Sequence, residues 1–279
     1  MWRNNRLVSL FTLIFRYNLS PYLGRQMNRT SLIYTPKPLA NARFRLLCFS
    51  YAGGNSATFL PWATLLPSTI ELSVVQLPGR GVRYGEPCYN DLQSLTLDLF
   101  NAYKKLPHKD TIFFGHSMGA RVAFELLIML RRFQSSLPLH FIASASAAPT
   151  IPRETIFHTL SDEDFIRQLG NISGAPKAAL ANPEIAELAL PSLRADFKII
   201  ETSPSGYRGQ MPMRLSILAG FDDRIRTEDL LAWQALFRST TDINWINGGH
   251  FFVDAQRDET ISVLLDTLTP TLETVAAAL

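Results

Sequence analysis

The fold is decided by residues 111–126, which read TIFFGHSMGARVAFEL. An apolar run of strand type leads into a Gly-x-Ser-x-Gly turn over residues 115–119, and a helical run follows from Ala120. On such a strand-to-helix turn the central residue, Ser117, exposes its hydroxyl. The glycines let strand and helix approach closely, and the helix amino terminus adds free N–H groups and positive potential beside the serine oxygen. The stretch predicts a serine nucleophile, and its alternative is an ordinary turn with a capping serine.

The composition is that of a globular protein with a substantial core. The chain has 279 residues, of which 47% are hydrophobic and 18% charged, and its formal net charge is +3. This length allows one large α/β domain or two small ones. The small net charge and the lack of a long Lys/Arg run argue against a nucleic-acid partner. Cys48 and Cys88 give neither a disulfide framework nor a metal-ligand spacing, which suits a reducing cytoplasm.

The first 26 residues form a separate extension before the main domain, which we place at 27–279. Residues 1–6 are basic and 7–15 mostly apolar, a pattern typical of a signal peptide or an amphipathic anchor. The apolar run is too short to span a bilayer, and no small-residue cleavage site follows it. A start codon assigned too early, with Met27 as the true start, is a third reading. We favour a dispensable extension and expect no stable membrane insertion.

Strand-type and helical runs alternate along the main domain. Strands are expected at 44–49, 72–77, 111–114, 139–144, 215–219 and 243–246, and helices at 92–106, 120–133, 227–237 and 259–278, the last interrupted near Pro270. This alternation predicts an α/β fold whose mainly parallel sheet carries helices on both faces. Residues 151–210, rich in Pro and Gly breaks, interrupt the alternation and predict an inserted helical lid. Ligands in such sheets bind beyond the carboxyl ends of the strands.

His250 is the predicted general base. It follows two glycines after the last expected strand, and it lies after Ser117 in the chain, as the hydrolase order of serine, acid and histidine requires. The other histidines fit less well. His108 and His140 precede strands and so lie at the opposite edge of the sheet. His116 shares the serine turn and is expected to pack there, and His158 lies in the 151–210 segment.

A carboxylate after the 215–219 strand should orient the base. Asp222 and Asp223 both qualify, and the spacing from Gly220 favours Asp223, which leaves Asp222 as a turn or cap residue. Two backbone N–H groups should stabilise the oxyanion. The first is expected from Met118, directly after the nucleophile, and the second from Ala52 or its neighbouring glycine in the loop after the first strand.

Four motifs, in their order along the chain, resemble type II thioesterases, the stand-alone α/β-hydrolases that serve non-ribosomal peptide and polyketide synthases. They are residues 49–54 (FSYAGG), 76–80 (QLPGR), 115–119 (GHSMG) and 248–252 (GGHFF). Residues 190–197 (LPSLRADF) and the pair at 232–233 add to this resemblance, which covers about 44–254. Two parts depart from the family pattern: the stretch before Met27, and residues 171–176, which replace a Gly-Gly-Thr-Pro-like turn and bear on acyl preference.

The resemblance implies hydrolysis of acyl groups from the phosphopantetheine arm of acyl or peptidyl carrier proteins, which frees misprimed or stalled synthase modules. It implies no metal and no tightly bound cofactor. The rivals are a medium-chain fatty acyl thioesterase, another serine carboxylesterase, and a non-catalytic carrier-binding protein. Carrier domains of this family's pathways are usually acidic, so Arg80 is expected either to contact the carrier or to pair with Glu86, and Arg83 is expected on the surface.

Overall fold

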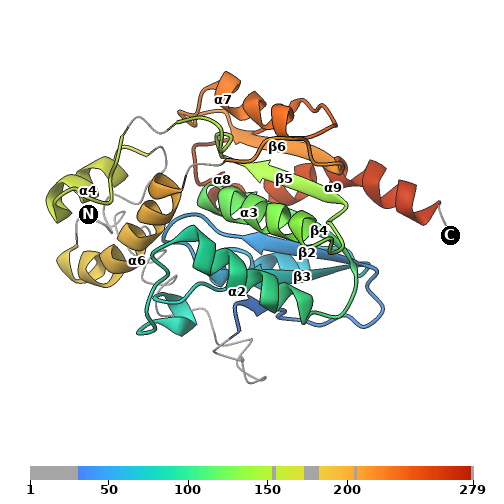
Figure 1. The fold of residues 1–279 in the computed structure, drawn as a ribbon, viewed down its shortest axis with the longest axis horizontal. Helices are drawn as coiled ribbons and strands as arrows, with labels where there is room; N and C mark the ends of the chain where they lie inside the picture. The colour runs from blue at the N-terminus through green and yellow to red at the C-terminus, as the bar shows by residue number, and fades with distance from the viewer. Residues whose placement is uncertain (1–30, 153–154, 173–181, 204–205, 278–279) are drawn as a thin grey trace, which may run out of the picture.

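The protein, described by a computed structural model for residues 31–152, 155–172, 182–203 and 206–277, is built on one seven-stranded sheet (Figure 1). The strands lie in the order β1-β3-β2-β4-β5-β6-β7. All neighbouring pairs are parallel except β1 with β3. The strands are β1 Ile33–Tyr34, β2 Phe44–Phe49, β3 Ile70–Val75, β4 Asp110–His116, β5 His140–Ser144, β6 Arg214–Gly220 and β7 Ile243–Ile246. The predicted α/β class is confirmed, and the short antiparallel β1 is an addition that the sequence did not predict.

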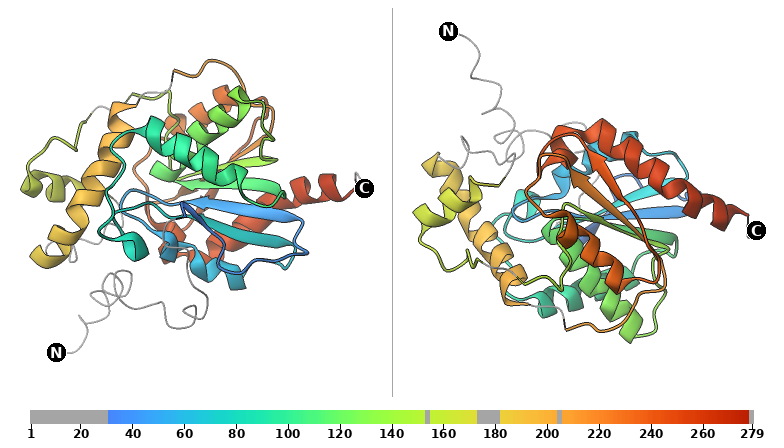
Figure 2. Two further views of the ribbon diagram at one scale, coloured as in Figure 1. Left: turned by 60° about the horizontal axis from the view of Figure 1, so that its bottom comes forward. Right: turned by 90° about the horizontal axis from the view of Figure 1, so that it is seen from above.

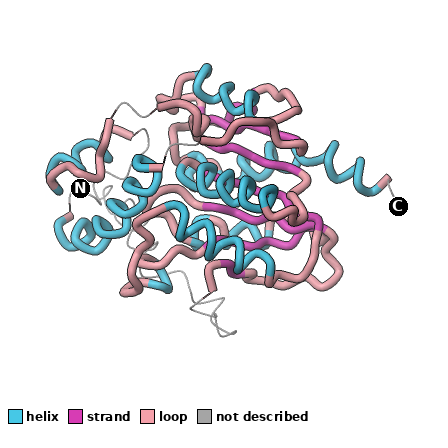
Figure 3. Tube along the Cα trace, viewed as in Figure 1, coloured by secondary structure: helices cyan, strands magenta, loops and turns pink. Residues whose placement is uncertain are grey.

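Helices cover both faces of the sheet, as Figure 3 shows. In Figures 1 and 2, α2, α3 and α7 lie on one face and α9 on the other. The helices are α2 Leu92–Lys104, α3 Met118–Arg132, α4 Asp162–Leu169, α6 Pro183–Thr202, α7 Thr227–Leu231, α8 Phe252–Ala255 and α9 Arg257–Ala276, and the 3-10 turns are η1 Ser56–Thr58, η2 Leu60–Thr64, η3 Gly81–Arg83 and η4 Ala232–Leu236. Two apolar cores result, one on each face of the sheet.

Successive side chains of β2 point to opposite faces of the sheet and so pack alternately into these two cores. Leu47 and Phe49 pack with the core under α2 and α3, while Leu46 and Cys48 pack with the core under α9. All four are fully buried, as expected for a central parallel strand with both faces covered. The strand therefore holds the loop that follows it, residues 50–55, in a fixed place at its carboxyl end.

The predicted interruption of the last helix at Pro270 is wrong. Helix α9 runs through this proline without a break. Proline removes one N–H donor from a helix, but Leu264 and Leu268 pack fully buried against the sheet. Packing of this kind contributes more to helix stability than one backbone hydrogen bond.

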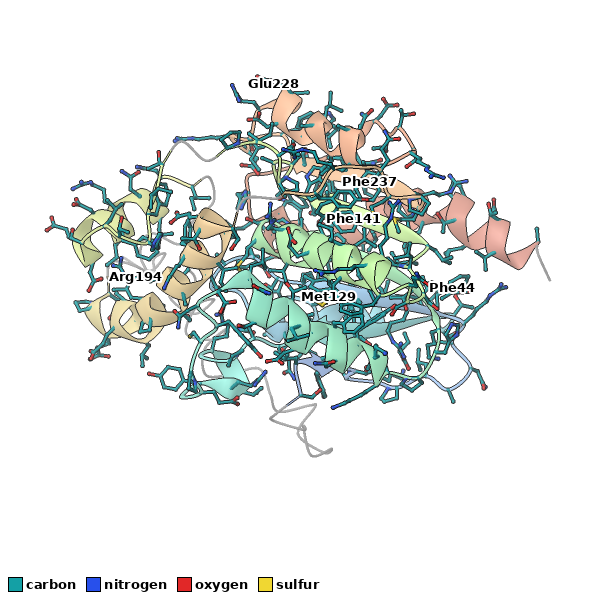
Figure 4. The ribbon with its side chains drawn as sticks, viewed as in Figure 1. Phe44, Met129, Phe141, Arg194, Glu228 and Phe237 are labelled. Carbon is teal, nitrogen blue, oxygen red and sulfur yellow. The ribbon has the colours of Figure 1, made fainter. Side chains whose placement is uncertain are left out.

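Helices α4 and α6 form a separate unit beyond the carboxyl ends of the strands. Phe165, Leu169 and Phe197 are its buried apolar centre. Phe44, the first residue of β2, and Arg194, on α6, lie at opposite ends of the molecule (Figure 4). The unit therefore stands at the edge of the sheet where ligands are expected. Its action as a lid remains a prediction, and residues 1–26 lie outside the described residues.

Candidate active site

Ser117 stands on a strained turn between β4 and α3. Its φ of 55° is in the left-handed region that side-chain-bearing residues rarely adopt. The turn needs both motif glycines: a Cβ at Gly119 would lie 2.1 Å from the backbone oxygen of Phe49, and one at Gly115 would lie 2.4 Å from Cα of Ala120. The Ser117 N–H donates to the backbone oxygen of Ser144 at 2.8 Å. The local sequence thus fixes the serine at the end of a central strand.

Three sequence-predicted site residues come together here. The Nε2 atom of His250 lies 2.9 Å from Oγ of Ser117, and its Nδ1 atom lies 2.8 Å from Oδ2 of Asp223. The histidine and aspartate side chains are only 12% and 7% exposed. The other oxygen of Asp223 accepts the N–H of Arg224 at 2.7 Å. Asp222 is exposed, and its N–H donates to the backbone oxygen of Gly248, so the structure places Asp223 and not Asp222 against the histidine.

His116 holds the backbone of His250 in place, a role that the sequence did not indicate. Its Nε2–H donates to the backbone oxygen of His250 at 2.8 Å, and Ser144 Oγ donates to its Nδ1 at 2.9 Å. This tautomer follows from the carbonyl, which can only accept. Complete burial, aided by the nearby His250, lowers the pKa of His116 to about 3. A neutral ring therefore holds the backbone of the predicted base.

The two expected oxyanion residues come from two different segments of the chain. Met118 begins α3, and Ala52 lies in the loop after β2. Among the residues that the structure describes, nothing accepts the N–H of either one. The N–H of Gly53, in contrast, donates to Oδ2 of Asp196 at 2.7 Å. Of the two donors that the sequence left open in this loop, Ala52 is the one without an acceptor in the described part of the chain.

Tyr51 ties the same loop to the segment after His250. Its hydroxyl donates to Oδ2 of Asp254 at 2.6 Å, and its ring makes edge contacts with His116 and Phe251. Burial raises the pKa of Asp254. The loops that carry the predicted base and the predicted oxyanion donor are therefore linked by a hydrogen bond and by ring contacts.

The expectations for the two arginines after β3 are corrected by their burial. Arg83, expected on the surface, is only 7% exposed, because it pairs with Glu86 at 2.7 Å and donates to the backbone oxygen of Gln76. Arg80 is 3% exposed and pairs with Asp196 instead of Glu86. Neither guanidinium is presented for docking a partner.

The remaining histidines lie away from the serine. His108 is exposed, and His140, at the start of β5, bonds to Thr271 and Ser216. His158 pairs with Glu201 of α6. In the described ranges, no group of three His, Cys, Asp or Glu side chains could hold a metal ion. Within the same ranges, every helix is too short or too polar to cross a membrane.

Comparisons with known proteins agree with this geometry. Residues 44–268 match the family described as "Thioesterase domain". Linear gramicidin dehydrogenase LgrE of Brevibacillus parabrevis is 35% identical over 85% of this chain and 92% of its own. The gramicidin S biosynthesis protein GrsT of Aneurinibacillus migulanus is 32% identical over 81% of this chain and 90% of its own.

A solved structure gives the same result. The type II thioesterase BorB from the borrelidin biosynthetic cluster superposes with a TM-score of 0.76 at 27% identity, over 88% of this chain and 99% of its own. The resemblance to type II thioesterases is thereby confirmed, and with it the α/β-hydrolase fold. The chain belongs to the thioesterase family and is a thioester-hydrolysing enzyme.

Proposed function

We propose that Ser117 is the nucleophile, with His250 as its general base and Asp223 as the group that orients the base. His250 takes the Ser117 proton at Nε2 while the serine oxygen attacks the thioester carbonyl. The N–H groups of Met118 and Ala52 stabilise the negative oxygen. The thiol leaves with the proton from His250, and water then hydrolyses the acyl-enzyme with His250 again as base. The observation that carries this proposal is the pair of short contacts, 2.9 and 2.8 Å, on the two ring nitrogens of His250.

The substrate we propose is an acyl group on the phosphopantetheine arm of an acyl or peptidyl carrier protein. Support comes from the relatives named for gramicidin and borrelidin biosynthesis. Removal of misprimed or stalled groups is the corresponding role in a synthase. We further propose the cytoplasm as its location, because Cys48 and Cys88 are both free thiols.

A redox role, of the kind named for LgrE, has no support in this chain. Dinucleotide-binding sheets carry a Gly-x-Gly-x-x-Gly turn after the first strand. The corresponding loop here reads Ser50-Tyr51-Ala52-Gly53-Gly54, and the sequence contains no such motif elsewhere. A hydrolytic role fits the same loop, because the backbone oxygen of Ser50 lies next to Gly119 of the serine turn.

The test is a Ser117→Ala variant assayed with one acyl group in three forms: a carrier-bound thioester, its N-acetylcysteamine thioester, and an oxygen ester. The wild type should prefer the carrier-bound form, and the variant should lose at least about 10³-fold in kcat with an unchanged melting temperature. A slow substrate should leave its acyl mass on Ser117. Near wild-type turnover by the variant would refute the assignment, and a preference for free medium-chain acyl thioesters would move the substrate to fatty acids.

A further inference from the structure

One buried carboxylate of α6 reaches two loops of the sheet domain. Asp196 is 1% exposed, and its Oδ2 atom accepts the N–H of Gly53 at 2.7 Å. The guanidinium of Arg80 donates to both carboxylate oxygens of Asp196: Nη2 lies 2.8 Å from Oδ1, and Nη1 donates to Oδ2. Such a two-pronged pair fixes the plane of the carboxylate. Asp196 is therefore held rigidly against the loop that carries Ala52.

Helix α6 touches the same loop through apolar contacts. A Cβ at Gly53 would lie only 2.5 Å from Cδ2 of Leu193, and the φ of Gly53 is +76°. The side chain of Ala52 packs against the cluster formed by Phe165, Leu169 and Phe197. The loop thus contacts the α4–α6 unit through its backbone and through its side chains.

Two hydrogen bonds, one within the loop and one to α6, hold the peptide planes on either side of Ala52. The carbonyl of Tyr51 accepts the N–H of Gly54 at 2.9 Å. In a trans peptide the N–H of Ala52 points opposite to that carbonyl, away from the turn. The next peptide plane, which ends in the N–H of Gly53, is held by Asp196. The N–H of Ala52 thus lies in a peptide plane held by the turn bond, and the plane that follows it is held by Asp196 of α6.

We propose that Asp196 is a positioning residue that makes the oxyanion site depend on the seating of α6. The N–H of Ala52 is aligned for the oxyanion while α6 lies on the loop, and it loses its alignment when α6 moves away. The inference rests on the proposed function, which supplies the role of Ala52. It assigns to the α4–α6 unit a part in the chemical step, in addition to any part in covering the site.

The choice of variant follows from the burial of the pair. In Asp196→Asn the amide oxygen stays at the Oδ2 position, opposite Gly53 and Nη1 of Arg80, and the NH₂ group faces Nη2 of Arg80. The carboxylate thus loses its charge and one of its two bonds to Arg80, and the acceptor of the Gly53 N–H is no longer held rigidly. An unpaired buried guanidinium also threatens folding. The double variant Arg80→Met with Asp196→Leu removes both charges, a replacement that buried pairs often tolerate, while it still removes the acceptor of Gly53.

Helix α6 offers a matched control. The side chain of Glu201 is also fully buried (0% exposed) and accepts the backbone N–H groups of Phe157 and His158 at 2.9 and 3.0 Å. Glu201→Gln therefore disturbs a buried carboxylate of the same helix, but away from the loop after β2. A loss caused only by a loosened helix would be the same in both variants.

The experiment measures kcat and KM on an N-acetylcysteamine thioester, the inhibition constant of a trifluoromethyl ketone that mimics the oxyanion, and the melting temperature. Interactions made only in the transition state lower kcat and not KM when lost, and one lost oxyanion donor costs about 10²–10³-fold. For a donor that is misaligned, we expect Asp196→Asn and the double variant to lose about 30-fold in kcat and in ketone affinity, with KM within about 3-fold. Glu201→Gln should stay within about 3-fold on both.

The inference is overturned if the folded double variant keeps wild-type kcat and ketone affinity, or if Glu201→Gln loses as much as Asp196→Asn. Ser117→Ala separates this result from failure of the proposed function. If Ser117→Ala is inactive while Asp196→Asn equals the control, only the inference about Asp196 fails. If Ser117→Ala is active, the site assignment itself fails.

Discussion

Replacing Asp223 by Asn should impair catalysis through the proton on His250, without moving any heavy atom. Oδ1 of Asp223 accepts the N–H of Arg224 at 2.7 Å, and Oδ2 faces Nδ1 of His250 at 2.8 Å. In Asp223→Asn the amide oxygen must stay opposite the Arg224 N–H, because an NH₂ there would face another donor. The NH₂ group then donates to Nδ1 of His250. The ring proton of His250 then sits on Nε2, which faces Ser117. With this proton in place, Nε2 cannot accept the proton of the serine hydroxyl.

The magnitude follows from that reversal. The wrong tautomer in an otherwise intact serine–histidine–carboxylate set lowers kcat by about 10⁴-fold, which corresponds to about 5 kcal/mol of lost transition-state stabilisation. Loss of a charge-assisted hydrogen bond alone contributes about 1.5–3 kcal/mol, or roughly 10–10²-fold. Any loss of kcat beyond about 10²-fold therefore measures the effect of the wrong tautomer itself.

The assay is kcat/KM on a small thioester for Asp223→Asn and for Asp222→Asn, with melting temperatures as a folding control. Asp222 is exposed and adjacent in the chain, so its variant should stay within about 3-fold of wild type. A larger loss for Asp222→Asn would refute the assignment. A loss below 10²-fold for Asp223→Asn would show that the reversed proton is not the cause.

The other predictions concern folding and the chain's first residues. Gly119→Ala should destabilise the protein by about 3 kcal/mol in urea unfolding, because its Cβ would lie 2.1 Å from the backbone oxygen of Phe49. Gly206→Ala is the control: a Cβ there would have nothing within 4 Å, so stability should be unchanged. Equal losses of stability in the two variants would contradict the packing argument. Burial lowers the pKa of His140 to about 4, so between about pH 4 and 6.5 only the unfolded chain binds this proton. The free energy of unfolding should then fall with decreasing pH by up to about 1.4 kcal/mol per pH unit from this residue, and His140→Gln should show a shallower slope than wild type. Deleting residues 1–26 should leave soluble, active enzyme; full-length chain that pellets with membranes while the truncated chain stays in solution would contradict this.

The sequence predicted what depends on local pattern. The turn at Ser117 and the place of His250 follow from strand-ending glycines and from chain order, and the structure brings the two residues together. What the sequence missed depends on partners far along the chain. Arginine is usually a surface residue, so the sequence predicts an exposed Arg83. Its burial depends on the folded chain, in which its guanidinium pairs with Glu86. Asp196 meets Gly53 across 143 residues, a contact that no local pattern encodes.

The site is assembled from segments that leave the ribosome far apart in time. Ser117 and His250 are separated by 133 residues, and Tyr51 and Asp254 by 203. Pairings at such separations form late, since long loops must close before the contacts stabilise them. A nascent chain therefore carries its serine turn without the proposed base, His250, until nearly the whole domain has been made. Under the proposed mechanism, a polypeptide arrested between Ser117 and His250 has no hydrolytic activity. The enzyme then acts on acyl groups only after synthesis of its domain is nearly finished.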